Sequence, residues 1–252
     1  MAFLELEIFS WKLQHRERVN VIMPQAQELA GVKSDGEKPK LLFLLHGLSD
    51  NHSMWARYTQ LERFALMHNV CIVMPSGGRS FYTDMKYGGK YYSYIAKELP
   101  KIIENMFNIS DKREDHAIAG LSMGGYGALK IGMRECDYFG YAAGISSVAD
   151  ILEGKKHFPS DMVNVFGEDM NVSDEDDLFK LADKTNYNSN KPKIYMAVGK
   201  SDFLYDANVR LRDKFNTLDF NYTYEEADGA HTWEFWNEYV QHVLKWFDKK
   251  ED

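Results

Sequence analysis

Short apolar runs recur along this chain, and each is bounded by polar residues, glycine or proline. The runs occupy residues 41–45, 70–74, 116–119, 141–146 and 193–198. Short runs without polar interruption are typical of strands that are buried on both faces of a sheet. We therefore expect a sheet with a layer of structure covering each face.

Segments with helical spacing of their apolar residues alternate with these runs. The segments lie at 53–67, 91–107, 123–134, 203–215 and 232–248. Pro100 falls inside the second segment, where it either kinks the helix or starts a new one. Strands that alternate with helices predict an α/β fold, with a mostly parallel central sheet, right-handed crossovers and helices on both faces.

The N-terminal residues follow a different pattern. Apolar residues alternate with polar ones over 4–8 and again over 19–21, and a polar corner at 12–18 separates the two stretches. This alternation predicts a half-buried antiparallel hairpin. Residues 28–40 are polar and contain glycine and proline, so we expect them to form an exposed connection.

Residues 151–190 interrupt the alternation of strands and helices. They are polar, carry an acidic run at 173–177, and have helical spacing only at about 175–184. Ser173 followed by Asp176 resembles a capping box, which would make the acids first-turn charges that the helix dipole favours. We expect this stretch to be a small insertion over the sheet edge.

The length and net charge limit the domain count and the partners. A chain of 252 residues fits a single domain, 1–252. Lys and Arg number 30 against 38 Asp and Glu, and the resulting charge of −8 gives no electrostatic basis for binding nucleic acid or an anionic membrane. We therefore expect a neutral small molecule as the partner, and self-association is left open.

Hydropathy and cysteine content indicate the compartment. No stretch approaches the roughly 18 to 20 apolar residues that a membrane span needs. The first residues, MAFLELEIFS, lack the basic start and apolar core of a secretory signal. Cys71 and Cys136 are too few for a disulfide framework of the small secreted type. We expect free thiols and a cytoplasmic protein.

A G-x-S-x-G motif, Gly120-Leu121-Ser122-Met123-Gly124, lies between a predicted buried strand and a predicted helix. A serine nucleophile has to project from a sharp strand-to-helix turn, and small residues two positions before and after it permit that turn. The start of the helix also directs N–H groups toward the serine, which suits a developing oxyanion. The motif predicts Ser122 as a nucleophile; the alternative is a glycine-rich turn with an incidental serine.

A serine hydroxyl becomes a good nucleophile when a base, commonly a histidine, takes its proton. Among eight histidines, His231 lies in the loop 228–231, after the strand-like stretch 222–226 and before the last helical segment. The α/β-hydrolase order, serine then acid then histidine, places the base there. The other histidines lie in polar connections, helices, a strand start or earlier loops: His15, His46, His52, His68, His116, His157 and His242.

The acid that orients the histidine should lie between Ser122 and His231, at the carboxyl end of a strand. Asp202 fits best, because it follows the apolar strand 194–198 after a short turn. Asp150 is the second choice, since it follows another apolar run in a similar way. Asp206 and Asp228 are more remote alternatives.

An oxyanion hole needs two N–H donors, one of which comes from the residue after the nucleophile. That residue is Met123. The second donor is expected from the loop after an earlier strand, where Gly47 allows the chain to turn back and Leu48 supplies the N–H. His46 in this loop is expected to be structural, because no acid is positioned behind it.

Aromatic residues flank the predicted catalytic loops. The tyrosine-rich stretch 79–94, with Tyr82, either lines a site for sugar or aryl groups or packs an exposed flank. Trp55, Trp233 and Trp236 are candidates for the walls of an acyl pocket, and core packing is the alternative. Trp55, Tyr82 and Trp233 are the residues we select as candidate substrate contacts.

Blocks spread over nearly the whole chain resemble the esterase D and tributyrin-esterase group of α/β-hydrolases, which is similar to feruloyl and acetyl esterases and, more remotely, to mycolyltransferases. The blocks are RVNVIMP, LLHGLSDNHSMW, MPSGGRSFYTDMKYG, GLSMGGYGALK, VGKSDFLYDANVRL and GAHTWEFW. The resemblance implies an α/β-hydrolase fold, here without a large lid. It also implies the triad Ser122, Asp202 and His231, the oxyanion donors Leu48 and Met123, and no metal or organic cofactor.

One departure from the group bears on the substrate. Its S-formylglutathione hydrolases usually have a cysteine soon after the HGL turn, whereas Ser49, Asp50 and Asn51 follow here. The expected function is a serine carboxylesterase that hydrolyses short acyl esters, acetyl to butyryl and including acylated sugars, through an acyl-enzyme. The alternatives are a feruloyl or cinnamoyl esterase, an S-formylglutathione hydrolase-like thioesterase, an acyltransferase, and an inactive hydrolase fold that binds a ligand or partner.

Overall fold

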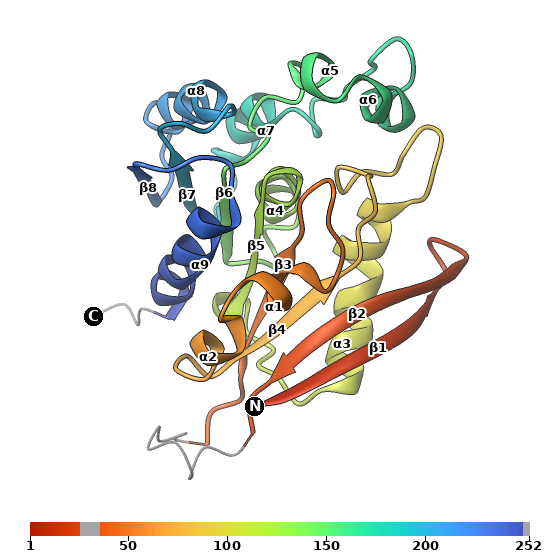
Figure 1. Cartoon of the computed structure of the whole chain (residues 1–252), viewed down its shortest axis with the longest axis vertical. Helices are drawn as coiled ribbons and strands as arrows, with labels where there is room; N and C mark the ends of the chain where they lie inside the picture. Colours follow the sequence, from red (N-terminus) through yellow and green to blue (C-terminus); the bar gives the residue numbers. More distant parts are fainter. Residues whose placement is uncertain (26–35, 249–252) are drawn as a thin grey trace.

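A twisted sheet runs through the whole molecule in the order β1-β2-β4-β3-β5-β6-β7-β8 (Figure 1). The structure is a computed structural model that describes residues 1–25 and 36–248. The strands are β1 (Ala2–Ser10), β2 (His15–Met23), β3 (Lys40–Leu45), β4 (Val70–Pro75), β5 (His116–Leu121), β6 (Tyr141–Ile145), β7 (Lys193–Gly199) and β8 (Tyr222–Ala227). Each apolar run of the sequence therefore forms a strand.

The sheet is parallel except at its N-terminal edge. Strand β1 pairs antiparallel with β2, and β2 pairs antiparallel with β4, whereas β3 to β8 are joined by parallel pairings only. The expected half-buried alternation is seen in β1, whereas β2 is buried on both faces over Val19–Ile22, where it pairs with β4. The predicted α/β-hydrolase sheet with an N-terminal antiparallel hairpin is confirmed.

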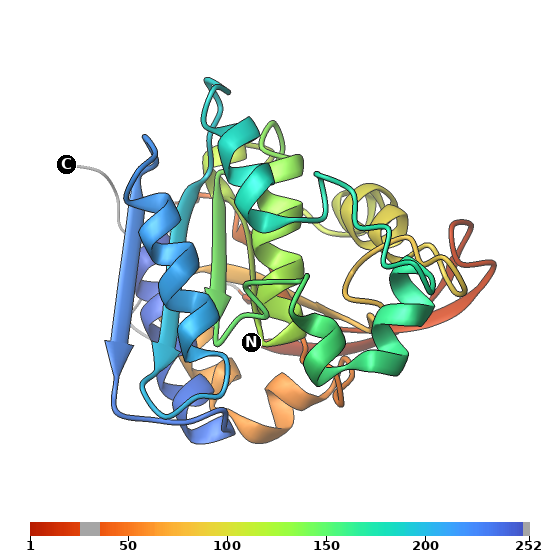
Figure 2. The same ribbon diagram turned by 90° about the horizontal axis from the view of Figure 1, so that it is seen from above.

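Helices cover both faces of the sheet (Figure 2). One apolar core joins a sheet face to α1 (Met54–Tyr58), α2 (Leu61–Ala65) and α9 (Trp233–Asp248). The other core joins the opposite face to η2 (Ser93–Glu98), α3 (Leu99–Met106), α4 (Met123–Arg134) and α8 (Tyr205–Phe215). A short 3-10 turn, η3 (Arg113–Asp115), precedes β5.

Two predicted helices are divided. The segment 53–67 breaks at Thr59, where the backbone is extended and the hydroxyl accepts a hydrogen bond from the Leu61 N–H, which ends α1 and starts α2. In the segment 91–107, Pro100 lies in the first turn of α3. The residues before it form the π-helical η2, and the backbone stays helical through Glu98 and Leu99, so the helix continues past the proline with a change from π to α type.

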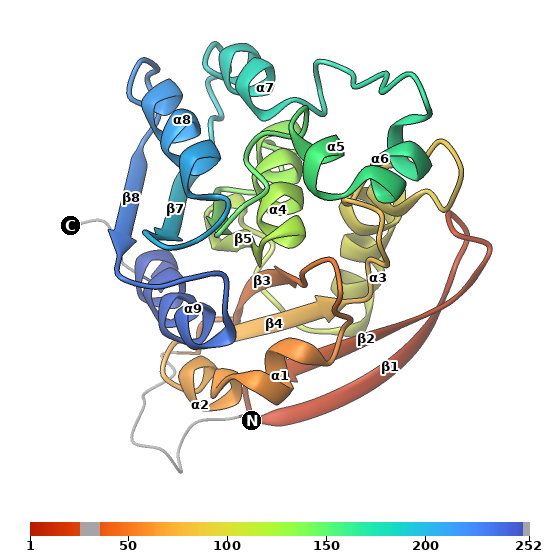
Figure 3. The ribbon, with the colours of Figure 1, turned by 45° about the horizontal axis from the view of Figure 1, so that its top comes forward.

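The insertion 151–190 contains three helices: α5 (Gly154–His157), α6 (Pro159–Phe166) and α7 (Leu178–Thr185). Asp177, not Ser173, caps α7, because its carboxylate accepts from the N–H groups of the first turn. Figure 3 shows the insertion helices as an outer group beyond α4. Helix α7 packs on α4 and α8 from the crossover between β6 and β7, and the position of the insertion over the sheet edge stays a prediction.

The structure can be compared with three further expectations from the sequence, on the cysteines, on membrane spans and on the connection 28–40. Cys71 and Cys136 are buried and free, as expected. No helix within residues 1–25 and 36–248 is long and apolar enough to cross a membrane. Of the predicted connection 28–40, residues 28–35 lie outside the described residues, 36–38 are exposed, and Lys40 already belongs to β3.

The topology gives the sheet a switch point between β3 and β5. The chain passes from β3 to β4 on one side and later continues from β5 toward β8 on the other. In open α/β sheets, ligands bind at the carboxyl ends of the strands beside such a point. The loops after β3, β5, β7 and β8 all end at this rim.

Candidate active site

Ser122 occupies a strained turn between β5 and α4, with φ of 55° and ψ of −118°. The two motif glycines make this turn possible. A Cβ on Gly120 would lie 2.4 Å from the Gly124 carbonyl, and a Cβ on Gly124 would lie 2.4 Å from the Leu45 carbonyl oxygen. The glycine spacing in the sequence therefore reflects a close approach of β3, β5 and α4 at the serine.

His231 lies between Ser122 and Asp202. Its Nε2 is 3.0 Å from Ser122 Oγ, and its Nδ1 is 2.9 and 3.1 Å from the two carboxylate oxygens of Asp202. Asp202 is buried, and the Leu204 N–H also donates to it at 2.9 Å. Because a carboxylate can only accept, Nδ1 carries the proton and Nε2 is left to accept the serine proton.

The structure places the alternative acids and bases elsewhere. Asp150 forms an ion pair with Arg210 at 3.0 Å and accepts from the Leu152 N–H. Asp206 and Asp228 are exposed. Three of the remaining histidines contact groups remote from Ser122: His68 with Asp248, His116 with the Ser110 carbonyl, and His242 with Glu225.

The two expected oxyanion donors belong to segments next to the serine. A Cβ on Gly47 would be 3.7 Å from Ser122 Cβ, so the loop after β3 passes directly beside the nucleophile. Leu48 follows in this loop, and Met123 is the first residue of α4. Within the described part of the chain, neither N–H donates a hydrogen bond to another protein group, which leaves both available to a ligand.

Among the described residues, no group of three or more His, Cys, Asp or Glu side chains is arranged to hold a metal ion. The chemistry that the arrangement offers is that of a serine nucleophile, a base that is oriented by a buried carboxylate, and two free N–H donors. This set of groups suits acyl transfer.

Comparison with known proteins agrees with this chemistry. Residues 10–247 match the Esterase family. The chain belongs to this family. It is a carboxylic ester hydrolase with the fold of serine hydrolases.

Relatives of this esterase cover its full length. An acetyl esterase from Caldicellulosiruptor saccharolyticus is 33% identical over 100% of both chains. The solved structure of the fluorophosphonate-binding serine hydrolase FphF from Staphylococcus aureus has a TM-score of 0.90 at 31% identity and covers 99% of each chain. The S-formylglutathione hydrolase FrmB from the same organism has a TM-score of 0.87 at 30% identity, over 98% of this chain and 99% of its own.

His46 holds the loop after β3, which carries the expected oxyanion donor Leu48. Its Nε2 accepts from the Gly77 N–H at 2.8 Å, so Nδ1 carries the proton and donates to the Gly47 carbonyl at 2.7 Å. That carbonyl belongs to the same peptide unit as the Leu48 N–H. Burial lowers the pKa of His46 to about 4, so the ring stays neutral and both bonds persist at neutral pH.

We expect His46 to make the folded esterase sensitive to acid. Its pKa in the unfolded chain is near 6.5 and in the folded protein about 4. Between these values only the unfolded chain binds the proton, so the free energy of unfolding falls as the pH drops, by about 3 kcal/mol in full. Below about pH 4, both states bind the proton, and His46 lowers the free energy of unfolding no further.

Urea unfolding at pH 7 and pH 4.5 tests this expectation, with the His46→Gln variant as the control. Glutamine can accept from the Gly77 N–H and does not titrate. The loss of stability between the two pH values should be smaller in the variant by about 2 kcal/mol. An equal loss in both proteins would contradict the assignment of a low pKa to His46.

The aromatic candidates are placed differently from one another. Trp55 and Tyr82 are fully buried, and their polar groups donate to the carbonyls of Leu45 and His46 at 3.0 and 2.9 Å. Both therefore support the loop after β3 from the interior. Trp233 is partly exposed and stacks on Tyr58, so of the three it is the one whose position is compatible with the expected substrate contact.

Two residues beside the site were not selected from the sequence. The ring of Phe203 lies 4.7 Å from that of His231 and is 54% exposed. Asp50 lies in the loop after β3, and burial raises the pKa of its carboxyl against the opposing effects of a Gly47 backbone hydrogen bond and the His231 charge. Both could have been selected from their positions in the sequence, because Phe203 directly follows Asp202 and Asp50 lies two residues after Leu48.

Proposed function

We propose that this esterase is a serine carboxylesterase that hydrolyses short acyl esters, acetyl to butyryl and including acylated sugars, through an acyl-enzyme. The observation that carries the proposal is His231 in hydrogen-bond contact with both Ser122 and Asp202. Ser122 is the proposed nucleophile, His231 the base and Asp202 the orienting acid, with the N–H groups of Leu48 and Met123 as the oxyanion hole.

The first half-reaction forms the acyl-enzyme. His231 Nε2 takes the proton of Ser122 as Oγ attacks the ester carbonyl, and Asp202 stabilises the imidazolium that results. The carbonyl oxygen becomes negative as the tetrahedral intermediate forms, and the N–H groups of Leu48 and Met123 donate to it. The intermediate then collapses, His231 protonates the departing alcohol, and the acyl group remains on Ser122.

The second half-reaction releases the acid. Water loses a proton to the same His231 nitrogen as it attacks the acyl-enzyme, and the same two N–H groups hold the second oxyanion. Return of the proton to Oγ expels the acid and restores the serine.

The preference for short acyl groups is supported by the surroundings of the site. Helix α7 of the insertion packs on α4, His157 of α5 contacts Phe203 beside the site, and the His231 side chain retains 19% exposure at the rim. An open rim offers little apolar surface for a long acyl chain, and burial of each CH₂ group would contribute about 0.8 kcal/mol. The full-length relative named an acetyl esterase agrees with this preference.

A series of nitrophenyl esters tests the acyl preference. We expect kcat/KM to be highest for acetate or butyrate and not to rise at octanoate, because the additional CH₂ groups gain no burial. The Ser122→Ala variant is the control for background hydrolysis. Faster turnover of octanoate than of butyrate would reject the short-chain proposal.

A thioesterase acting on S-formylglutathione is the second candidate, because of the likeness to FrmB. The first candidate is favoured by Ser49, Asp50 and Asn51, which stand where the formylglutathione enzymes usually have a cysteine. Side-by-side assays of S-formylglutathione and butyrate esters distinguish the two. A kcat/KM for the thioester at least about 100-fold above that for butyrate would favour the second candidate.

A further inference from the structure

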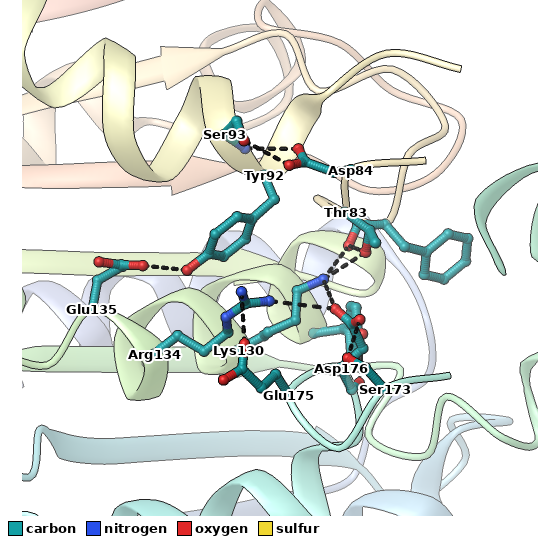
Figure 4. Close-up of polar contacts among 12 residues, drawn as sticks. Thr83, Asp84, Tyr92, Ser93, Lys130, Arg134, Glu135, Ser173, Glu175 and Asp176 are labelled. Atoms are coloured by element: carbon teal, nitrogen blue, oxygen red, sulfur yellow. Dashed lines mark hydrogen bonds and ion pairs between the residues drawn. The ribbon is translucent and has the colours of Figure 1, made fainter. Parts of the chain in front are cut away.

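A lysine is fully buried in α4, about two turns after Ser122 (Figure 4). Lys130 Nζ donates to the Phe81 carbonyl at 3.2 Å, to Thr83 Oγ1 at 2.5 Å and to Asp176 Oδ1 at 3.2 Å. The three donors of the ammonium group are thus all used. A buried lysine is costly unless it is paired and hydrogen-bonded, and the mechanism above gives this one no part.

Two of its contacts lie on an unusual piece of backbone. Phe81 and Tyr82 both have positive φ, 49° and 50°, and both side chains are fully buried. Large non-glycine residues rarely adopt this conformation, and it persists only where the surroundings enforce it. Lys130 donates to the Phe81 carbonyl, which joins these two residues, and to the hydroxyl of Thr83, which follows them. It therefore holds the strained turn in place.

The strained turn directs Tyr82 beneath the loop after β3. The Tyr82 hydroxyl donates to the His46 carbonyl at 2.9 Å. Its ring lies between two glycines, since a Cβ on Gly77 or on Gly127 would come within 2.5 or 2.4 Å of it. A ring held this closely moves with its backbone, so a shift of the turn would reach His46 and the peptide that carries the Leu48 N–H.

Opposite charge surrounds Lys130 on the side of the insertion. Asp176 accepts from Ser173 at 2.7 Å as well as from Lys130, and Arg134 lies 3.6 Å from it. Burial raises the pKa of Asp176, but Lys130, Ser173 and Arg134 together lower it below its usual value. Asp176 is therefore the counter-charge of a buried lysine, whereas Asp177 of the same acidic run caps α7.

The remaining groups around Lys130 are consistent with a charged amine. The Tyr126 ring lies 4.7 Å from Nζ, the Tyr92 ring lies 5.9 Å from it, and Asp84 adds a favourable charge. Burial lowers the pKa of Lys130 to about 8 against the attraction of Asp176. The amine is therefore largely protonated at neutral pH and can make its three bonds.

We propose that Lys130 is a positioning residue for the oxyanion hole. It holds the strained turn at Phe81 and Tyr82, and Tyr82 in turn supports the loop that presents the Leu48 N–H. This inference rests on the proposed function, because it assumes that Leu48 donates to an oxyanion. Because Asp176 belongs to the insertion and pairs with Lys130, this role also connects the insertion to the oxyanion hole.

The Lys130→Met variant tests the proposal, because methionine fills a similar volume without charge or donors. We expect kcat for a butyrate ester to fall by about 10- to 100-fold, since small displacements at a reacting centre cost that much, while KM stays within about twofold. The matched control is Arg134→Met, on the next turn of α4. Arg134 contacts Asp176, Glu175 and the Tyr92 ring, and its loss should leave kcat unchanged.

A double-mutant cycle with Tyr82→Phe separates positioning from general destabilisation. This variant removes one hydroxyl, and we expect the same loss of kcat at constant KM. If Lys130 acts through Tyr82, the loss in the double variant is smaller than the product of the two single losses. Thr83→Val replaces Lys130→Met in the cycle if the latter does not fold.

The outcomes of the cycle are distinct. Single losses that multiply, or an unchanged kcat in Lys130→Met, would overturn the positioning role while the wild type remains a Ser122-dependent esterase. An equal loss in Arg134→Met would show that any weakening of the insertion has the same effect, and would also overturn it. A wild type without Ser122-dependent activity would remove the proposed function itself.

Discussion

Replacement of Ser122 by alanine should lower kcat for a butyrate ester by at least about 10⁴-fold, because loss of a catalytic serine removes the covalent route and leaves only binding and the oxyanion donors. The measurement is steady-state hydrolysis by purified protein at neutral pH. KM should change little, since the hydroxyl contributes to chemistry more than to ground-state binding.

The stability of this variant is the necessary control. Alanine at position 122 keeps the backbone and removes a single hydroxyl, so we expect the free energy of unfolding to stay within about 1 kcal/mol of wild type. Substantial residual turnover by a folded Ser122→Ala protein would contradict its role as nucleophile.

Asp202→Asn should have the second largest effect, about a 10⁴-fold loss of kcat. The asparagine amide can donate to His231 Nδ1, which would place the imidazole proton on Nε2. The ring could then no longer accept the proton of Ser122, although the three side chains would keep their positions.

Asp150→Asn is the matched control for this substitution, because Asp150 was the second choice of acid and pairs with Arg210. Its kcat should stay within about twofold of wild type. A large loss in Asp150→Asn together with a small loss in Asp202→Asn would transfer the role of the acid to Asp150.

The parts of the fold that the sequence predicts well are those in which one local pattern decides the outcome. Continuous apolar runs become β3, β5 and β7 because both faces of a parallel sheet are covered. The helix after the motif was predicted with its observed limits, because Gly120 and Gly124 mark the turn that precedes it. The residues brought together at the rim were predictable for the same reason, as each follows a strand end.

Long-range contacts account for what the sequence did not predict. Nothing near Asp176 in the sequence indicates that its partner is Lys130, so a helix cap was the available local explanation. Tyr82 likewise lies in a tyrosine-rich stretch that is typical of ligand-binding loops. Only the tertiary structure shows that its ring packs between Gly77 and Gly127. The break at Thr59 depends on one side-chain hydrogen bond, which helical spacing does not reveal.

Mass spectrometry of the protein after treatment with a fluorophosphonate tests the central claim most directly, because the reagent reacts covalently with activated serines. The account predicts a single adduct on Ser122 in the native protein, strongly slowed formation in His231→Ala, and none after denaturation. An unlabelled Ser122 in the folded wild type, or labelling at another serine, would contradict it.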